Sequence, residues 1–507
     1  MAGGHAPSPA TRPPPVNDPH RPAVSDARPA SRPPETTAFR RAGHPARRSL
    51  PPVTLREGAE QHRAVGKLQA LVRIPTVSHR DPAQVDTAAF DAFLEELERQ
   101  FPLLHEHLHL TRVHTHGLLL HWRGSSDERP VVLMAHLDVV PVEGEWQHPP
   151  FSAAIADGCI WGRGTLDDKG CLVGICEAVE TLLERGHTPA QDLWLSFGCD
   201  EEVFGLAAPL AVAELRQRGV RPWFVLDEGG AIASEAFPGV GAPIGVIGVT
   251  EKGTTSVELR AEGRGGHAST PARNGPTARI ARAITALERA PLPASLPGPT
   301  IELFRRLAPH APLPLRPLMA RADRLRPVLT RALLAAGPET AAMARTTVAV
   351  TTLSGSPALN VIASTARAGV NLRLMVGDTV SDVLAHVRRT VGDGVEVDVL
   401  ESGEASPVSP YSVVDGAGGY TEVDEAFALL EDTITEVFPD AVPAPYVMMA
   451  ATDSRHFTAI CERVYRFAPF RMTKAQRESI HSYDEHLGVE AFLDGVDWYR
   501  RLIERLP

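Results

Sequence analysis

The chain has 507 residues, of which 43 % are apolar and 22 % are charged, as is usual for globular proteins. Its 51 basic and 62 acidic residues leave a net charge of −11, which argues against a general nucleic-acid-binding surface. Five cysteines without a Cys-x-x-Cys pair indicate neither a disulfide framework nor a thiolate zinc site. No apolar run has the length of a membrane span, and the first residues contain no signal-peptide core. We therefore expect a cytoplasmic protein with no membrane span and no nucleic-acid partner.

Residues 1–50 differ in composition from the rest of the chain. They contain eight arginines, eleven prolines and only three acidic residues, with few large apolar side chains. Such a segment cannot bury enough apolar surface to offset the entropy lost on ordering, so it is expected to be a disordered arm. A solvated tail without a role and an electrostatic contact with RNA, membrane or a partner are both open explanations.

From residue 51 to about residue 250 the pattern alternates between strands and helices. The stretch Pro130–Val140 is a continuous apolar run of the kind expected for a buried parallel strand. This order predicts an α/β catalytic part, with an open, mostly parallel sheet and helices on both faces. The further predicted elements are helices at Glu60–Val72, Asp168–Arg185 and Ala207–Gln217, and strands at Leu193–Gly198 and Trp223–Leu226.

A second pattern covers residues 251–404. Alternating strands and two helices predict a smaller α+β domain, a lid inserted into the larger one, and the α/β pattern returns over 405–507. Within the insert, about 291–340 is rich in Pro, Leu and Arg and is read as a helical or loop excursion. The predicted strands are Thr254–Ala261, Thr346–Thr352, Ala366–Leu374 and Val395–Leu400, and the predicted helices are Arg279–Arg289 and Val380–Thr390.

Five clusters of acidic residues or histidine stand where predicted strands end, which is where ligands bind in open α/β sheets. Each cluster has an ordinary explanation by itself, such as a solvated run of charge. The glycine-rich turn before Asp167 and Asp168 is not a phosphate cradle, because adjacent aspartates repel phosphate and no Gly-Lys-Ser/Thr follows. The clusters are His136-Leu137-Asp138, Asp167-Asp168, Asp200-Glu201-Glu202, Asp227-Glu228 and the region of His481.

The combination of these clusters is more informative than any one of them. Two histidines and three carboxylates at separate strand ends, with one additional glutamate, are what a two-metal hydrolytic site requires. A ligand set of nitrogen and oxygen atoms without cysteine suits zinc, with cobalt or manganese as alternatives.

The chain resembles the di-zinc metallopeptidase family that includes carboxypeptidase S, aminoacylase, acetylornithine deacetylase and succinyl-diaminopimelate desuccinylase. The resemblance covers roughly residues 55–505 and is strongest for the carboxypeptidase S branch. Ala363 stands where the family often has proline, and the segment after His481 departs from the version common in that branch. The matching stretches are AHLDVVPV, WQHPPFSAAIADGCIWGRGTLDDKG, GCDEEVFG, LDEGG, GRGGHASTP, ALNVIAS, ATDSRHF and IHSYDEHL.

The resemblance implies roles for particular residues. One zinc ion would be bound by His136, Asp167 and Asp227, and the other by Asp167, Glu202 and His481, with Asp167 bridging. Asp138 would orient His136, and Glu201 would be the general base. His267 would stabilise the oxyanion, in many family members from a partner subunit, so a homodimer through the lid is expected. Substrate-binding positions would be Asn360, Arg373 and Arg455, with Arg455 holding a carboxylate.

These roles predict a zinc-dependent hydrolase for an amide bond adjacent to a free carboxylate. Its substrate would be a short peptide or an N-acyl amino acid. Two alternatives stay open. The enzyme could remove an acetyl or succinyl group from a biosynthetic intermediate, since fold and site do not decide the substrate. The chain could also be a non-catalytic binding protein on the same fold.

Overall fold

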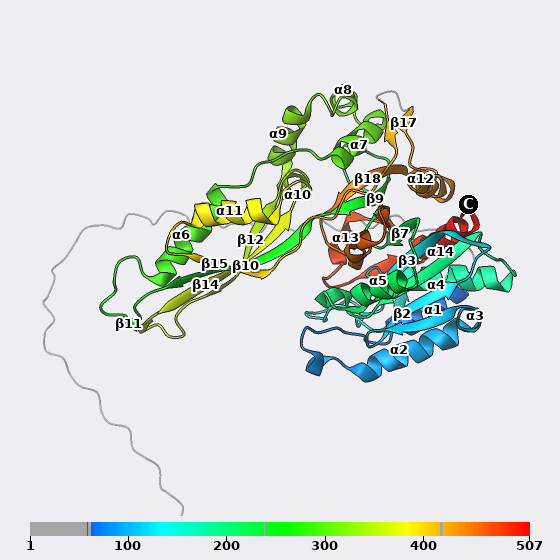
Figure 1. Ribbon diagram of the computed structural model, residues 1–507, viewed down its shortest axis with the longest axis horizontal. Helices are drawn as coiled ribbons and strands as arrows, with labels where there is room; N and C mark the ends of the chain where they lie inside the picture. The colour runs from blue at the N-terminus through cyan, green and yellow to red at the C-terminus, as the bar shows by residue number, and fades with distance from the viewer. Residues whose placement is uncertain (1–57, 59–61, 238, 416–418) are drawn as a thin grey trace, which may run out of the picture. The chain divides into compact units, whose positions relative to one another are not determined.

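The computed structural model describes residue 58 and residues 62–237, 239–415 and 419–507 (Figure 1). The arm predicted for residues 1–50 therefore lies outside the described residues. A ten-stranded mixed sheet forms the larger part of the fold, with its central neighbours β6, β3, β7 and β19 running parallel. Its strands, in spatial order, are β1 (His109–Val113), β2 (Gly117–Trp122), β6 (Gln191–Gly198), β3 (Ser126–His136), β7 (Phe224–Asp227), β19 (Val464–Arg466), β9 (Ile244–Glu251), β8 (Ala231–Ala233) and β20 (Arg471–Met472), with β18 (Val442–Met448) beside β9.

Alternation along the central strands explains why helices cover both faces of this sheet. Leu133 of β3 packs into a cluster with residues of several helices, while its neighbours Val132 and Met134 pack on the opposite face against α5. Both faces of β3 are thus apolar, as a buried parallel strand requires. The helices are α1 (Arg63–Val72), α2 (Thr87–Gln100), α3 (Pro102–His107), α4 (Lys169–Glu184), α12 (Glu425–Val437) and α14 (Val489–Glu504) in the first cluster or its surroundings, and α5 (Ala207–Gln217) in the second.

The strand predicted at Pro130–Val140 ends at His136, four residues earlier than expected. The reason is a change of partner, because the Val139 amide donates to Thr76 O at 3.0 Å and Ser78 N donates to Val139 O at 3.1 Å. The chain therefore leaves the sheet directly after His136, which places the following residues at the edge of the sheet.

A separate four-stranded antiparallel sheet has the order β12 (Thr347–Ser354), β14 (Thr365–Leu374), β10 (Gly253–Glu262), β15 (Glu396–Glu401). Buried and half-buried residues alternate along β10, so one face of the sheet is apolar. Helices α6 (Pro276–Arg289) and α11 (Val380–Val391) lie along this sheet (Figure 1) and bury its apolar face in a common core. All six elements predicted for this part are present. The predicted fold class, an α/β sheet with an inserted smaller α+β part, is confirmed.

The excursion between α6 and β12 is helical: α7 (Gly298–Leu307), α8 (Arg316–Ala320), α9 (Arg326–Ala336) and α10 (Pro338–Ala342). Its inner side forms a core of its own with residues of β9 and β18. No helix in the described part of the chain is both long enough and apolar enough to cross a membrane. The remaining elements are β4 (Ala154–Ala156), β5 (Cys159–Trp161), β11 (Gly266–His267), β13 (Val361–Ile362), β16 (Val413–Val414), β17 (Tyr420–Glu422), α13 (Lys474–Ser479), β21 (His486–Gly488) and short 3₁₀ turns.

Candidate metal centre and active site

Three parallel strands end side by side and carry the acidic clusters to one edge of the sheet. His136, the last residue of β3, is paired in register with Gly198, the last residue of β6, and β7 runs along the other side of β3. The loops that follow these strands therefore meet, as expected at the carboxyl ends of an open sheet.

Asp167 is shared by two groups of side chains that have the geometry of metal sites. In the first group, His136 Nε2 lies 3.0 Å from Asp167 Oδ1 and 3.8 Å from Glu228 Oε1. In the second, His481 Nε2 lies 2.9 Å from Asp167 Oδ2 and 3.0 Å from Glu202 Oε2. In each group the potential ligand atoms lie within 4.8 Å of one another. The two oxygens of Asp167 thus face different histidines, as a bridging carboxylate would.

Glu228, and not Asp227, completes the first group, which differs from the sequence prediction. Asp227 ends β7 as a buried residue, and its Oδ2 accepts a hydrogen bond from the Ser454 amide at 3.0 Å. Glu228 lies in the bend that follows β7, and its carboxylate is the one that reaches His136 Nε2. Glu228 is thus the carboxylate beside His136 Nε2 in this geometry, and the assignment of Asp227 as a ligand stays a prediction.

His136 is oriented by the loop that follows it. Its Nδ1 lies 2.9 Å from the carbonyl oxygen of Asp138 and 3.4 Å from Asp138 Oδ1. A proton on Nδ1 satisfies both acceptors and leaves the lone pair of Nε2 free toward Asp167 and Glu228. The Asp138 carboxylate also accepts the amides of Glu201 and Glu202, each at 3.2 Å. Asp138 therefore fixes both the histidine and the turn that carries the two glutamates.

Carboxylates are crowded at this edge of the sheet, and burial changes their protonation. Burial raises the pKa of Glu201 and of Glu228 well above the usual range, and the neighbouring carboxylates add to the effect. Burial likewise raises the pKa of Asp453 to about 7. Hydrogen bonds to Asp167 and Glu202 raise the pKa of His481 to about 10. The site has an excess of negative charge that bound cations would neutralise.

The donor set fits two divalent cations. Each group offers one imidazole nitrogen and carboxylate oxygens, which suits zinc, cobalt or manganese rather than the all-oxygen preference of calcium. Glu201 belongs to neither group and its carboxylate accepts no hydrogen bond from a described residue. The backbone of His481 has a φ of 58°, which is uncommon for a residue other than glycine and is typical of a constrained functional position.

Two residues that were not singled out from the sequence hold Asp167 in place. Glu485 Oε1 accepts the amides of Leu166 and Asp167 at 2.8 and 3.2 Å, and its Oε2 accepts Arg163 Nη1 at 2.6 Å. Arg163 Nη2 also donates to Ser482 O at 2.6 Å, next to His481. Both residues occur within the matching stretches, but their partnership joins segments more than 300 residues apart and is visible only in the fold.

Arg455 lies beside the turn that carries Glu201. Its guanidinium is 4.9 Å from the centre of the Phe204 ring, and Nη1 donates to Thr452 O at 2.8 Å. Phe204 follows directly on the 3₁₀ turn Glu201–Val203. The structure therefore brings this predicted substrate-binding residue close to the predicted general base.

The other three predicted residues lie in the inserted smaller part and belong to neither metal group, and only Arg373 is in its four-stranded sheet. His267 is exposed in β11, with Nδ1 2.7 Å from Ser269 Oγ. Asn360 is also exposed, and its carbonyl accepts the amide of Ala268 at 3.1 Å. Arg373 of β14 donates through Nη1 to Thr254 Oγ1 at 2.7 Å.

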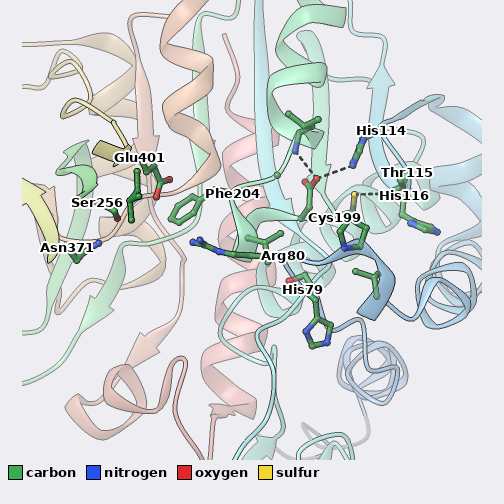
Figure 2. Close-up of a pocket in the computed structure, with 18 of the residues that line it drawn as sticks. His79, Arg80, His114, Thr115, His116, Cys199, Phe204, Ser256, Asn371 and Glu401 are labelled. Atoms are coloured by element: carbon green, nitrogen blue, oxygen red, sulfur yellow. Dashed lines mark hydrogen bonds and ion pairs between the residues drawn. The ribbon is translucent and has the colours of Figure 1, made fainter. Parts of the chain in front are cut away.

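A cavity of about 830 Å³ lies next to the loop that carries Glu201 and has the size of a ligand pocket. Figure 2 shows His79, His114 and His116 on one side of it and Ser256, Asn371 and Glu401 on the other. Asp200 and Phe204 line it, whereas none of the residues of the two metal groups does. The cavity thus shares a loop with the metal centre without containing it.

The carboxyl edge of this α/β sheet thus carries two groups of nitrogen and oxygen ligands, the arrangement that a metal-dependent hydrolase requires. Residues 132–505 match the family model described as Peptidase family M20/M25/M40, and the chain belongs to this family. The predicted resemblance is thereby confirmed, and the chain is an enzyme of the amidohydrolase and metallopeptidase type.

Two relatives illustrate the similarity in sequence. The chain is 36 % identical over 462 residues to the N-fatty-acyl-amino acid synthase/hydrolase PM20D1 of Xenopus tropicalis, covering 88 % of this chain and 86 % of the relative. It is 34 % identical over 421 residues to the probable carboxypeptidase S-like 2 of Dictyostelium discoideum, covering 82 % and 79 %.

Solved structures show the same fold at lower identity. A metallo-carboxypeptidase of the M20 family, Sso-CP2 from Sulfolobus solfataricus, gives a TM-score of 0.61 at 17 % identity, covering 87 % of this chain and 99 % of that one. Human carnosine dipeptidase 1 gives 0.59 at 16 % identity, covering 88 % and 97 %. The Bacillus subtilis YXEP protein, described as a dinuclear metal binding peptidase, gives 0.52 at 14 % identity, covering 88 % and 98 %.

Proposed function

We propose that this enzyme uses two zinc ions to hydrolyse the amide bond of N-acyl amino acids or short peptides that end in a free carboxylate. The observation that carries the proposal is the position of Asp167, whose two oxygens face two separate histidine and carboxylate groups. One ion would be held by His136, Asp167 and Glu228, and the other by Asp167, Glu202 and His481. Cobalt and manganese are alternatives with the same donor set.

Bound divalent cations polarise a carbonyl oxygen and lower the pKa of water. Glu201 is the residue assigned to move the proton. The Asp138 carboxylate fixes its backbone, and burial keeps its pKa raised, which favours a group that accepts a proton and then returns it. In the forward direction Glu201 takes a proton from the attacking water and delivers it to the leaving amine.

Arg455 would bind the substrate carboxylate, since its guanidinium is held by Thr452 O and by the face of Phe204 beside Glu201. His267 would stabilise the oxyanion. Because His267 is exposed in β11 and lies outside both metal groups, we assign this role to His267 of a second copy of the chain in a homodimer. Asn360, in the turn before β13, and Arg373 of β14 would line the substrate site from the inserted smaller part.

The relatives support both substrate classes, since one is named for N-fatty-acyl amino acids and another for carboxypeptidase S. The test is amino-acid release from a matched panel of dipeptides, N-acetyl amino acids and N-long-chain-acyl amino acids, with and without a chelator. The variant Glu201→Gln is the inactive control of this assay. It is expected to keep both metals but to lose activity by roughly 10²–10⁴-fold or more.

Chelator-sensitive release from acylated amino acids would identify an aminoacylase, and release from dipeptides would identify a dipeptidase or carboxypeptidase. Release only from N-acetylated or N-succinylated biosynthetic intermediates would favour the alternative reaction. Near-normal turnover by Glu201→Gln would overturn the assigned mechanism.

A further inference from the structure

The helical excursion has an inner face that anchors it to the rest of the enzyme. Met319, Ala322, Leu329 and Leu333 are buried in a cluster with Phe304 of α7. This face gives α8 and α9 (Figure 1) a fixed position, so their outer face is a defined surface rather than a loose loop.

The outer surface of residues 312–331, which include α8, the turn after it and the start of α9, is strongly basic although the whole chain carries a charge of −11. The acidic residue in the middle of this stretch, Asp323, is already paired, with Oδ2 3.3 Å from Arg305 Nη2. The arginines of the outer face form no ion pair with any residue in the described ranges. They are all exposed: Arg316, Arg321, Arg324, Arg326 and Arg331.

Large apolar side chains stand among these arginines. Leu313 is 76 % exposed, Leu315 37 % and Val328 49 %. Pro312, Pro314 and Pro317 alternate with the leucines, and because proline fixes its φ angle they restrict the backbone around both exposed side chains. A leucine side chain gains no favourable contact from water or phosphate. Leucines that lie among unpaired arginines therefore fit a partner that has both charged groups and an apolar interior.

We propose that this α8–α9 surface, formed by the five arginines with Leu313, Leu315 and Val328, docks on a bilayer that contains anionic lipids. Arginines would contact headgroup phosphates and carboxylates, and the apolar side chains would enter the boundary of the acyl chains. The charge of the surface is complementary to such a bilayer, while the net charge of the chain is not. A nucleic acid would use the arginines but would gain little from exposed leucines.

The test is co-sedimentation of the full chain with vesicles of phosphatidylcholine alone and of phosphatidylcholine with phosphatidylserine, at low and at physiological salt. Binding is expected only to the anionic vesicles, and it should weaken as salt rises. The variant R321Q/R324Q/R326Q should lower the partition coefficient about a hundredfold, and L313S/L315S about tenfold. Hydrolysis of a water-soluble substrate should stay unchanged in both variants.

The matched control is R289Q/R388Q/R389Q, which removes three exposed arginines from α6 and α11 and so changes the net charge equally. This variant should bind anionic vesicles like the wild type. The proposal is overturned if the control loses as much binding as R321Q/R324Q/R326Q, or if the latter still binds like the wild type, as it would if residues 1–50 made the contact. Binding of an RNA duplex that depends on the arginines while L313S/L315S leaves vesicle binding unchanged would also overturn it.

Discussion

The guanidinium of Arg163 and the carboxylate of Glu485 form a buried ion pair in which Nη1 lies 2.6 Å from Oε2. The second oxygen of Glu485 accepts the amides of Leu166 and Asp167. A residue near the C-terminus therefore sets the backbone position of the carboxylate that both metal groups share.

Replacement of Glu485 by alanine should destabilise the enzyme strongly, because it leaves the Arg163 charge buried without its partner. Removal of one member of such a pair typically costs about 3–5 kcal/mol. Chemical denaturation of the metal-free protein measures the change. Glu485→Gln keeps an oxygen for the two amides and should retain more stability. If Glu485→Ala unfolds with an unchanged midpoint, the ion pair does not stabilise the fold.

Glu228→Ala and Asp227→Asn provide a direct test of the ligand assignment. Glu228 faces His136 and Asp167, so its loss should reduce the metal content or weaken metal affinity by at least 10–100-fold. Asp227→Asn keeps an oxygen that can accept the Ser454 amide and should retain both metals. Metal content after dialysis distinguishes the two variants. The reverse result would restore the assignment made from the sequence.

The large sheet was predictable because its central strands are apolar on both faces and because acidic clusters follow them. Continuous burial over the last seven residues of β3 and along all of β6 produces the continuous apolar runs that are typical of buried parallel strands. The order of strands in space was not predictable, since it depends on packing between segments that are distant in sequence. The alternating strands of the smaller sheet and the two helices that cover it could also be predicted from the sequence.

The sequence does not determine which of the two carboxylates, Asp227 or Glu228, lies beside His136. Both are carboxylates at the end of β7, Asp227 as its last residue and Glu228 as the first residue of the bend that follows. Only the position of β7 relative to β3 decides which of them faces His136. The supporting role of Glu485 was missed for a related reason, because its partners are backbone amides that carry no signal in the sequence.

Metal binding should become tighter as pH rises. In the metal-free enzyme the pKa of His481 is raised to about 10 by Asp167 and Glu202, so the imidazole is protonated at neutral pH. A cation must displace that proton, and for one proton released the affinity should rise about tenfold per pH unit over the range below about pH 10. Competition with a chelator of known affinity measures this slope. A pH-independent affinity would contradict it.

The same ion pairs predict the opposite trend for the stability of the metal-free protein. A histidine with a raised pKa contributes stability that is fully present below its unfolded value near 6.5 and is lost as pH rises through about 10. Denaturation of the chelated enzyme between pH 7 and 10 should therefore show declining stability. His481→Asn is the control and should show a flatter profile.

Arg455→Ala should weaken the binding of substrates that end in a free carboxylate. Loss of a charge-assisted contact should raise KM by about one to two orders of magnitude, with a smaller effect on kcat. A substrate with an amidated terminus is the control and should be affected little. Equal losses on both substrates would show that Arg455 supports the fold and not the substrate.

Glu251 controls the position of Arg455 through a chain of buried contacts. Its Oε2 accepts the amide of Thr452 at 3.0 Å and lies 3.2 Å from Arg466 Nε, while Thr452 O accepts Arg455 Nη1 at 2.8 Å. Glu251 is also the last residue of β9, where the chain enters β10, and its Oε1 accepts Ser406 Oγ at 3.1 Å from the returning segment.

Glu251→Gln should therefore raise KM for carboxylate substrates while it leaves metal content unchanged. Glutamine offers one oxygen and no charge where Glu251 offers two oxygens, so it cannot hold Thr452, Ser406 and Arg466 equally well, and Thr452 and Arg455 should shift together. Glu251→Ala should in addition destabilise the fold by about 3–5 kcal/mol, because Arg466 is fully buried.

The double variant Glu251→Gln/Arg455→Ala should have the same KM as Arg455→Ala alone, since both changes act on the same contact. Additive effects on KM would show that Glu251 acts on the substrate by another route.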